Sequence, residues 1–145
     1  MLCSRMPTAE RLEYMRQYGK NYREAGKLKK HKQSSVHAWL VDKMNGIRSS
    51  KAKRQLPVEI EVEYLEALWE TQGGRCALTG VQMTTKFGSL FAASPDRIDS
   101  SRGYVKGNVQ LVSKAANLAK GSASDEDLRE WIAAIRSSGG KPNNG

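Results

Sequence analysis

Two oxygen-bearing side chains in the second half of the chain have the types and spacing of a cation site. Asp96 ends a predicted strand, and Asn117 lies in a predicted helix about twenty residues further on. That interval allows a loop and a return, so that the helix packs across the strand. A carboxylate and an amide oxygen suit a hard divalent cation, whose other positions substrate and water can fill. We therefore expect this pair to hold a cation that assists phosphodiester hydrolysis.

Asn108 and Lys120 accompany this pair. Asn108 begins the segment that leads into the helix, where its amide is expected to tie the loop to the strand. Lys120 follows Asn117 by three residues, on a neighbouring position of the same helical face, and is expected to contact phosphate. Structural interpretations remain open: Asp96 as a turn acid, Asn117 as a cap or solvent-facing residue, and Lys120 as a cation at a helix C-terminus.

The elements that must position these residues form an α+β pattern. Two short strands are predicted within residues 81–98. Ser124 with Asp127 forms a capping-box pattern that opens the last helix. Apolar stripes predict helices over residues 8–30, 34–47, 59–72, 109–120 and 125–137. The inward face predicted for the last helix consists of Leu128, Trp131, Ile132 and Ile135.

The positive charge is concentrated in the first 56 residues. The chain of 145 residues has a net charge of +9. Residues 1–56 contain 14 basic and 4 acidic side chains, whereas residues 57–145 contain 10 basic and 11 acidic ones. This imbalance exceeds what solubility requires, and binding to a phosphate backbone explains it best. The expected contacts are Lys27, Lys29, Lys30 and Lys32, a cluster without a base-reading motif.

The second half of the chain resembles a known family. Residues 95–121 read PDRIDSSRGYVKGNVQLVSKAANLAKG, and residues 73–80 read GGRCALTG. With residues 73–80 as the lead-in to residues 95–121, these segments resemble HNH endonucleases of the endonuclease VII-like type, in the phage-encoded variant with D-R-I-D. The resemblance covers roughly residues 60–121. It implies a small ββα-metal (His-Me finger) core, to which the residue patterns add an N-terminal basic helical arm and a C-terminal helix.

The resemblance assigns roles to single residues. Asp96 and Asn117 match metal ligands, and Asn108 matches the residue that holds the loop. Arg97 stands where the family usually has a catalytic His. Because arginine stays protonated, it is expected to clamp a phosphate rather than act as a base. Asp99 is expected to orient water, with a metal-bound hydroxide or the substrate's own phosphate as alternatives. Further phosphate contacts are expected at Lys120, Arg102 and Lys106.

Cysteine content marks a second departure from the family. Many relatives hold structural zinc with four cysteines, whereas Cys76 is the one such residue in the matching segment. We therefore expect no structural zinc, and the cofactor implied is a divalent cation, Mg²⁺ or Mn²⁺. The sequence contains no run of about 18 apolar residues, so a transmembrane helix is not expected. It also lacks the pattern of a secretory signal, which favours the cytoplasm, that of the host cell if the protein is phage-encoded.

These inferences predict a divided chain. Residues 1–56 form a basic arm and linker, residues 57–138 a nuclease domain, and residues 139–145 a flexible tail. The expected function is metal-dependent hydrolysis of DNA phosphodiesters by a phage or mobile-element endonuclease. Duplex or branched DNA is the expected partner, RNA is possible as a substrate, and no membrane is involved. The alternative is a non-catalytic nucleic-acid-binding protein on a degenerate HNH fold.

Overall fold

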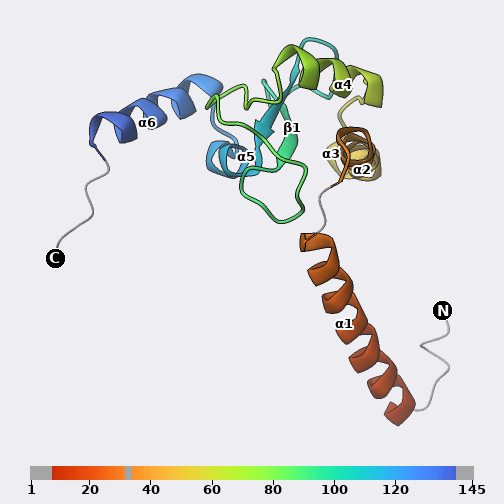
Figure 1. The fold of residues 1–145 in the computed structure, drawn as a ribbon. Coiled ribbons are helices and arrows are strands. Elements are labelled where there is room, and N and C mark those ends of the chain that lie inside the picture. The colour runs from red at the N-terminus through yellow and green to blue at the C-terminus, as the bar shows by residue number, and fades with distance from the viewer. Residues whose placement is uncertain (1–7, 32–33, 140–145) are drawn as a thin grey trace.

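A computed structural model describes residues 8–31 and 34–139 of the chain, and it is an α+β structure (Figure 1). A long N-terminal helix precedes a group of shorter elements built around one antiparallel strand pair. The elements in chain order are α1 (Thr8–His31), α2 (Val36–Ser49), α3 (Lys51–Arg54), α4 (Val62–Thr71), β1 (Ala93–Arg97), β2 (Val109–Ser113), α5 (Lys114–Lys120) and α6 (Asp125–Ser137).

β1 and β2 pair in antiparallel fashion, with Asp96 opposite Gln110. The prediction of a helix over residues 109–120 is wrong for its first part, because Val109–Ser113 is β2. All five side chains of β2 are buried, and such a segment shows no helical period. The helix α5 follows at once, and the Ser113 hydroxyl caps it by accepting from the backbone N–H of Ala116 at 3.2 Å.

The region before β1 differs from the prediction of two strands within residues 81–98. β1 is the one strand that forms there. The segment before it makes isolated bridges, between Arg75 and Gln82 and between Thr84 and Ala92. The side chain of Gln72 instead forms hydrogen bonds with the backbone at the outer edge of β2. Its amide nitrogen donates to the Leu111 carbonyl at 2.8 Å, and its amide oxygen accepts from the Leu111 N–H at 3.0 Å. The Gln72 side chain thus forms the two hydrogen bonds to the Leu111 backbone that a third strand would otherwise form.

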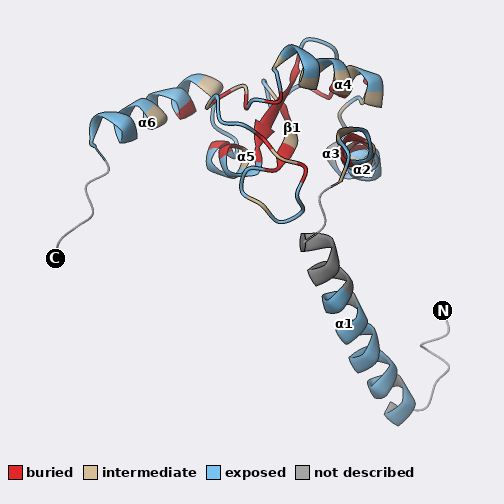
Figure 2. Ribbon diagram, viewed as in Figure 1, coloured by how far each residue is buried: buried red, intermediate tan, exposed pale blue. Residues whose placement is uncertain are grey.

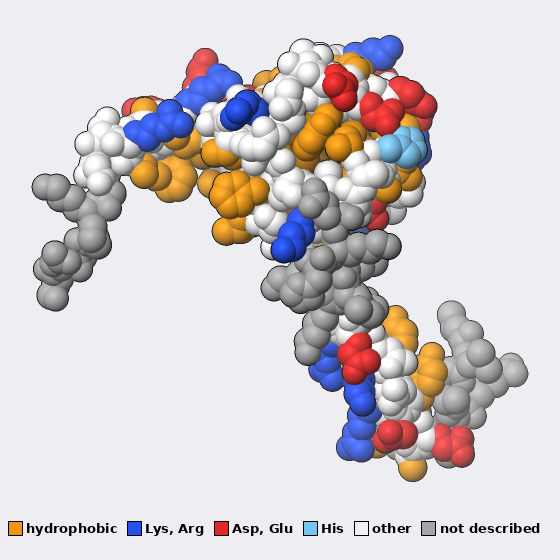
Figure 3. All heavy atoms as spheres, in the orientation of Figure 1, with side chains coloured by type: hydrophobic (Ala, Val, Ile, Leu, Met, Phe, Trp, Pro, Cys, Tyr) orange, Lys and Arg blue, Asp and Glu red, His pale blue; other side chains and the backbone are white. Residues whose placement is uncertain are grey.

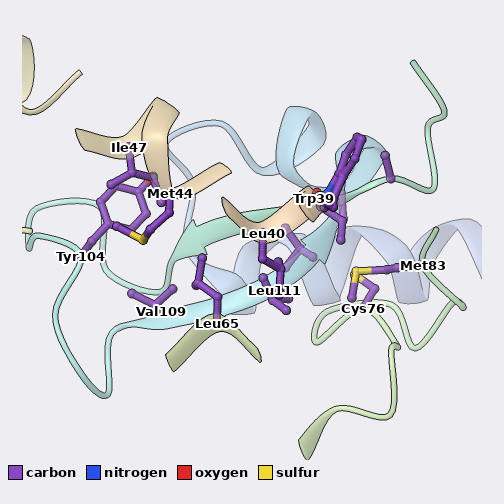
Figure 4. Close-up of a cluster of buried hydrophobic side chains, with 14 of the residues drawn as sticks. Trp39, Leu40, Met44, Ile47, Leu65, Cys76, Met83, Tyr104, Val109 and Leu111 are labelled. Carbon is purple, nitrogen blue, oxygen red and sulfur yellow. Dashed lines mark hydrogen bonds between the residues drawn. The ribbon is translucent and has the colours of Figure 1, made fainter. Parts of the chain in front are cut away.

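The hydrophobic core extends across the boundary predicted at residue 56 (Figure 4). Leu40 of α2 and Leu65 of α4 are fully buried, together with Leu111 of β2. The Trp39 indole N–H donates to the Ala93 carbonyl at 2.8 Å and so ties α2 to β1. The predicted linker at residues 48–57 contains the short helix α3. The basic segment is therefore divided, with α2 belonging to the core and α1 lying outside it.

The two outer helices are far less buried than the core (Figure 2). α1 extends away from the other elements, and Leu12, Met15 and Tyr18 are each more than half exposed. α6 has the predicted bounds and capping box, but only Leu128 of its predicted inward face is buried. Trp131 is 55% exposed. Within the described residues, no helix combines the length and apolarity that a membrane span needs.

Candidate functional site

Asp96 and Asn117 lie on one strand–helix interface, but each has its own partner. Ser94 and Asp96 are two residues apart on β1, so their side chains point to the same face of the strand pair. The Asn117 amide nitrogen donates to the Ser94 hydroxyl at 3.0 Å. The Lys120 ammonium donates to Asp96 Oδ2 at 2.6 Å. The helix α5 thus lies across this face, with Lys120 rather than Asn117 beside Asp96.

Lys120 is buried at the end of β1 rather than exposed for phosphate contact. Its side chain is 1% exposed. The ammonium donates to Asp96 Oδ2 at 2.6 Å, to the Arg97 carbonyl at 2.9 Å and to the Ile98 carbonyl at 3.4 Å. An ammonium has three N–H groups to share among the oxygens around it. Asp125 Oδ1, from the first turn of α6, lies 2.7 Å from the same nitrogen and forms an ion pair with it.

Gln110 joins the two carboxylates around Lys120. Its amide nitrogen lies 3.0 Å from Asp96 Oδ2 and 3.0 Å from Asp125 Oδ2, and donates to both. Burial lowers the pKa of Lys120, but the hydrogen bonds and charges of Asp125 and Asp96 outweigh it, so that this pKa lies above its ordinary value. The ammonium is therefore a fixed positive charge at neutral pH, and it connects β1, α5 and α6.

Arg97 is used within the loop that follows β1. One guanidinium nitrogen, Nη1, donates to the Ser100 carbonyl at 2.9 Å and to the Arg102 carbonyl at 3.2 Å. The guanidinium carbon lies 5.5 Å from the centre of the Tyr104 ring, a cation–π distance. Arg97 is half-buried, and its contacts stabilise the turn instead of leaving all its donors for a phosphate.

Asp99 closes the same loop from the exposed side. Its Oδ1 accepts from the Ser101 hydroxyl at 2.6 Å and from the Ser101 N–H at 2.9 Å. These bonds, the hydroxyl bond first, together with the charge of Arg102 lower the pKa of the Asp99 carboxyl. A carboxylate of lowered pKa is a weak base, so this arrangement favours binding or orienting water over removing its proton.

Asn108 fixes the loop from within and is only 1% exposed. Its amide nitrogen donates to the Asp99 carbonyl at 3.1 Å and to the Gly103 carbonyl at 2.9 Å. Its amide oxygen accepts from the Asp99 N–H at 2.9 Å. One buried side chain thus binds both ends of the turn that follows Asp96, and this determines where the loop backbone lies.

Arg102 and Lys106 are exposed and line a groove of about 750 Å³. The groove is also lined by Leu56, Pro57 and Glu59, in the segment after α3. Leu56 and Pro57 also line a second hollow, of about 680 Å³, beside Arg48 and Lys51 of α2 and α3. Basic side chains from two distant parts of the chain therefore border two hollows that share Leu56 and Pro57, an arrangement that suits a phosphate backbone.

The lysine cluster of the arm lies at the edge of the described chain. The backbone of Lys27, Lys29 and Lys30 belongs to α1, whereas their side chains and the whole of Lys32 lie outside the described residues. In the described part of α1, basic side chains lie along one side of the helix (Figure 3). Arg16, Lys20 and Arg23 recur there at helical spacing.

The sequence did not single out Ser94, Gln110 or Asp125 as site residues. Gln110 lies opposite Asp96 through cross-strand pairing, and Asp125 reaches Lys120 and Gln110 from the start of α6. The capping-box pattern located the start of that helix, but no local pattern indicates that its first residue returns to β1. Among the described residues, no three His, Cys, Asp or Glu side chains form a metal-binding group.

No family model, curated protein or solved structure matches this chain. Two carboxylates and two backbone carbonyls surround the Lys120 ammonium, and a loop with exposed basic residues adjoins it. All four groups present oxygen, the ligand type of hard divalent cations.

Proposed function

We propose that this chain is a metal-dependent endonuclease of the HNH type, acting on DNA. The observation that carries the proposal is the placement of Asp96 at the end of a strand pair crossed by a helix, next to a loop with exposed basic residues. A carboxylate that can hold a divalent cation beside a bound strand is what metal-assisted phosphodiester hydrolysis requires. The ordered sequence motifs around it support the same proposal.

The oxygen set fits the implied cation in its chemistry. Asp96 and Asp125 provide carboxylates, and the carbonyls of Arg97 and Ile98 face the same point. Asn117 is half-buried one helical turn away, bonded to Ser94. A divalent ion bound by Asp96 would supply charge stabilisation at the phosphate and an acidic bound water. Asp96 is its first ligand in this proposal.

Other residues of the chain would position the loop, bind the DNA strand and orient water. Asn108 holds the turn 99–103 in place, and Arg97 supports it from the other side. Arg102 and Lys106 would receive the strand in the groove against Pro57. The arm would add contacts with flanking phosphates, which are insensitive to sequence. In this proposal Asp99 orients water, as its exposed carboxylate is accessible to solvent.

Two observations favour a second function. The Lys120 ammonium is the cation that Asp96 binds, and Arg97 directs its donors to backbone carbonyls. A chain in which both arrangements persist on DNA would bind without cutting. This is the nucleic-acid-binding alternative, on a degenerate fold of the same kind.

Nicking of supercoiled plasmid with Mg²⁺ or Mn²⁺ distinguishes the two functions. The endonuclease proposal predicts metal-dependent nicking by the wild type and its loss in Asp96→Asn, with DNA binding retained in a gel shift. Lys114→Met, which removes an exposed lysine from the same helix α5, is the matched control and should still nick. Absence of nicking by folded wild type with either metal would leave only the binding function.

A further inference from the structure

Lys120 stands out among the charged groups of the molecule because it is buried inside a shell of oxygens. Its side chain is 1% exposed, whereas those of Asp96 and Asp125 are 9% and 14% exposed. Four oxygens lie between 2.6 and 3.4 Å from one nitrogen: Asp96 Oδ2, Asp125 Oδ1 and the carbonyls of Arg97 and Ile98. A cation is thus already bound where the proposed function needs one.

The ammonium and a divalent ion would compete for the same oxygen. Asp96 Oδ2 already accepts from Lys120 and from Gln110 at 3.0 Å. A metal ligated by this oxygen would lie about 2.0–2.6 Å from it. Two cations at such distances on one carboxylate repel each other strongly in a region with little water. Only one of them can therefore occupy this position at a time.

The charges around the site also favour replacement of the Lys120 ammonium by a metal ion over binding of a metal ion beside it. Two carboxylates face a single ammonium, so the cluster formed by Asp96, Asp125 and Lys120 has a formal charge of −1. Removing the ammonium alone would leave two carboxylates with little solvent around them and no counter-charge, which is strongly unfavourable. A divalent cation would neutralise both carboxylates, which makes it the natural replacement.

We infer that Lys120 is the resident cation of this site, and that a divalent metal binds Asp96 and Asp125 only by displacing its ammonium. The inference rests on the proposed function for the presence of the metal, and it extends that function by adding Asp125 and a competing lysine. A displaced Lys120 side chain would leave the interior at the end of β1, beside the loop that carries Arg102 and Lys106. Metal binding would thereby release a positive charge close to the proposed strand path.

Calorimetric titration with Mn²⁺ tests this directly without any assay of activity. In Lys120→Met, which removes the terminal ammonium and leaves an unbranched, uncharged side chain one atom shorter, Mn²⁺ should bind at least about tenfold more tightly than in wild type, a change of about 1.4 kcal/mol. Lys114→Met should bind as wild type does. Adding Asp125→Asn to Lys120→Met should abolish the gain. Equal affinity in wild type and Lys120→Met, or no binding by either, would overturn the inference.

Amine labelling of the wild type covers the case in which Lys120→Met does not fold. Without metal, Lys120 should be protected from an amine-acylating reagent while Lys114 is modified. With saturating Mn²⁺, Lys120 should become modified and Lys114 should not change. Protection of Lys120 that persists at the highest Mn²⁺ concentration would overturn the inference.

The two proposals fail separately. Wild type that nicks plasmid while Lys120→Met gains no affinity contradicts the exchange and leaves the endonuclease function intact. Tighter Mn²⁺ binding by Lys120→Met in a protein that never nicks supports the exchange and contradicts the endonuclease function.

Discussion

The helix α1 and the unit formed by β1, β2 and α5 use positive charge in opposite ways. On α1, Arg16 has a side chain that is 79% exposed, and it pairs with Glu13, whose side chain is 72% exposed. At the end of β1, Lys120 is 1% exposed and contacts two carboxylates and two carbonyls. Charge on the arm is available to a partner, whereas charge at Lys120 positions the protein's own elements. Composition alone does not separate these two uses.

The largest difference between α1 and the core is expected in how a substitution changes the free energy of unfolding. Leu40 is fully buried in α2, whereas Leu12 of α1 is 58% exposed. Leu40→Ala should lower the free energy of unfolding by about 2–5 kcal/mol, because it leaves a cavity in a packed core. Leu12→Ala should change it by less than about 0.5 kcal/mol. Urea unfolding of both variants measures this, and equal losses would show that α1 packs against the protein in solution.

The loop residue Asn108 provides the second test. Asn108→Ala removes three hydrogen bonds and leaves buried backbone groups without partners, so a loss of about 2–3 kcal/mol is expected. Asn21→Ala is the control on the arm, where Asn21 accepts one exposed bond from Gln17 at 2.9 Å. Thermal unfolding should show a clear drop for the first variant and almost none for the second. An Asn108→Ala variant that unfolds at the wild-type temperature would contradict the role of Asn108 in holding the loop.

Secondary structure in this chain was largely predictable, whereas the contacts at the site were not. The bounds of α6 follow from Ser124 and Asp127, a local pattern whose physics lies within one helical turn. The sequence pattern predicts helix where β2 forms, because all the side chains of β2 are buried and the two-residue alternation of apolar and polar residues that marks a strand is absent. The pairing of Lys120 with Asp125 depends on how α6 leaves α5, and no local pattern encodes that path.

The arm is expected to dominate affinity for DNA. Replacing Lys27, Lys29, Lys30 and Lys32 by serine should weaken binding to duplex of any sequence, by roughly tenfold or more, since each phosphate that a lysine neutralises releases counterions. The slope of log K against log salt should become shallower by about 0.9 for each phosphate that is no longer neutralised. Fluorescence anisotropy over a salt series measures both quantities. An unchanged slope would place the phosphate-binding side chains elsewhere, with the groove at Arg102 and Lys106 as the next candidate.

The smallest effect is expected from pH. The pKa of Lys120 is raised in the folded protein, so its stabilising contribution is complete below the ordinary lysine pKa of about 10.4 and is lost as pH rises above that value. Wild type should therefore lose stability in this alkaline range more steeply than Lys120→Met. Denaturant unfolding of both proteins from neutral to alkaline pH measures the difference, and parallel curves would contradict the ion-paired state of Lys120.

Single-turnover cleavage with saturating protein and Mg²⁺ tests most directly whether the end of β1 carries the chemistry while the arm carries the affinity. For Asp96→Asn we predict full occupancy of DNA without cleavage. For the arm variant with four serines we predict a wild-type cleavage rate once enough protein is added to occupy the DNA. Cleavage at the wild-type rate by Asp96→Asn would contradict the account, because the proposed first metal ligand would then play no part in the reaction.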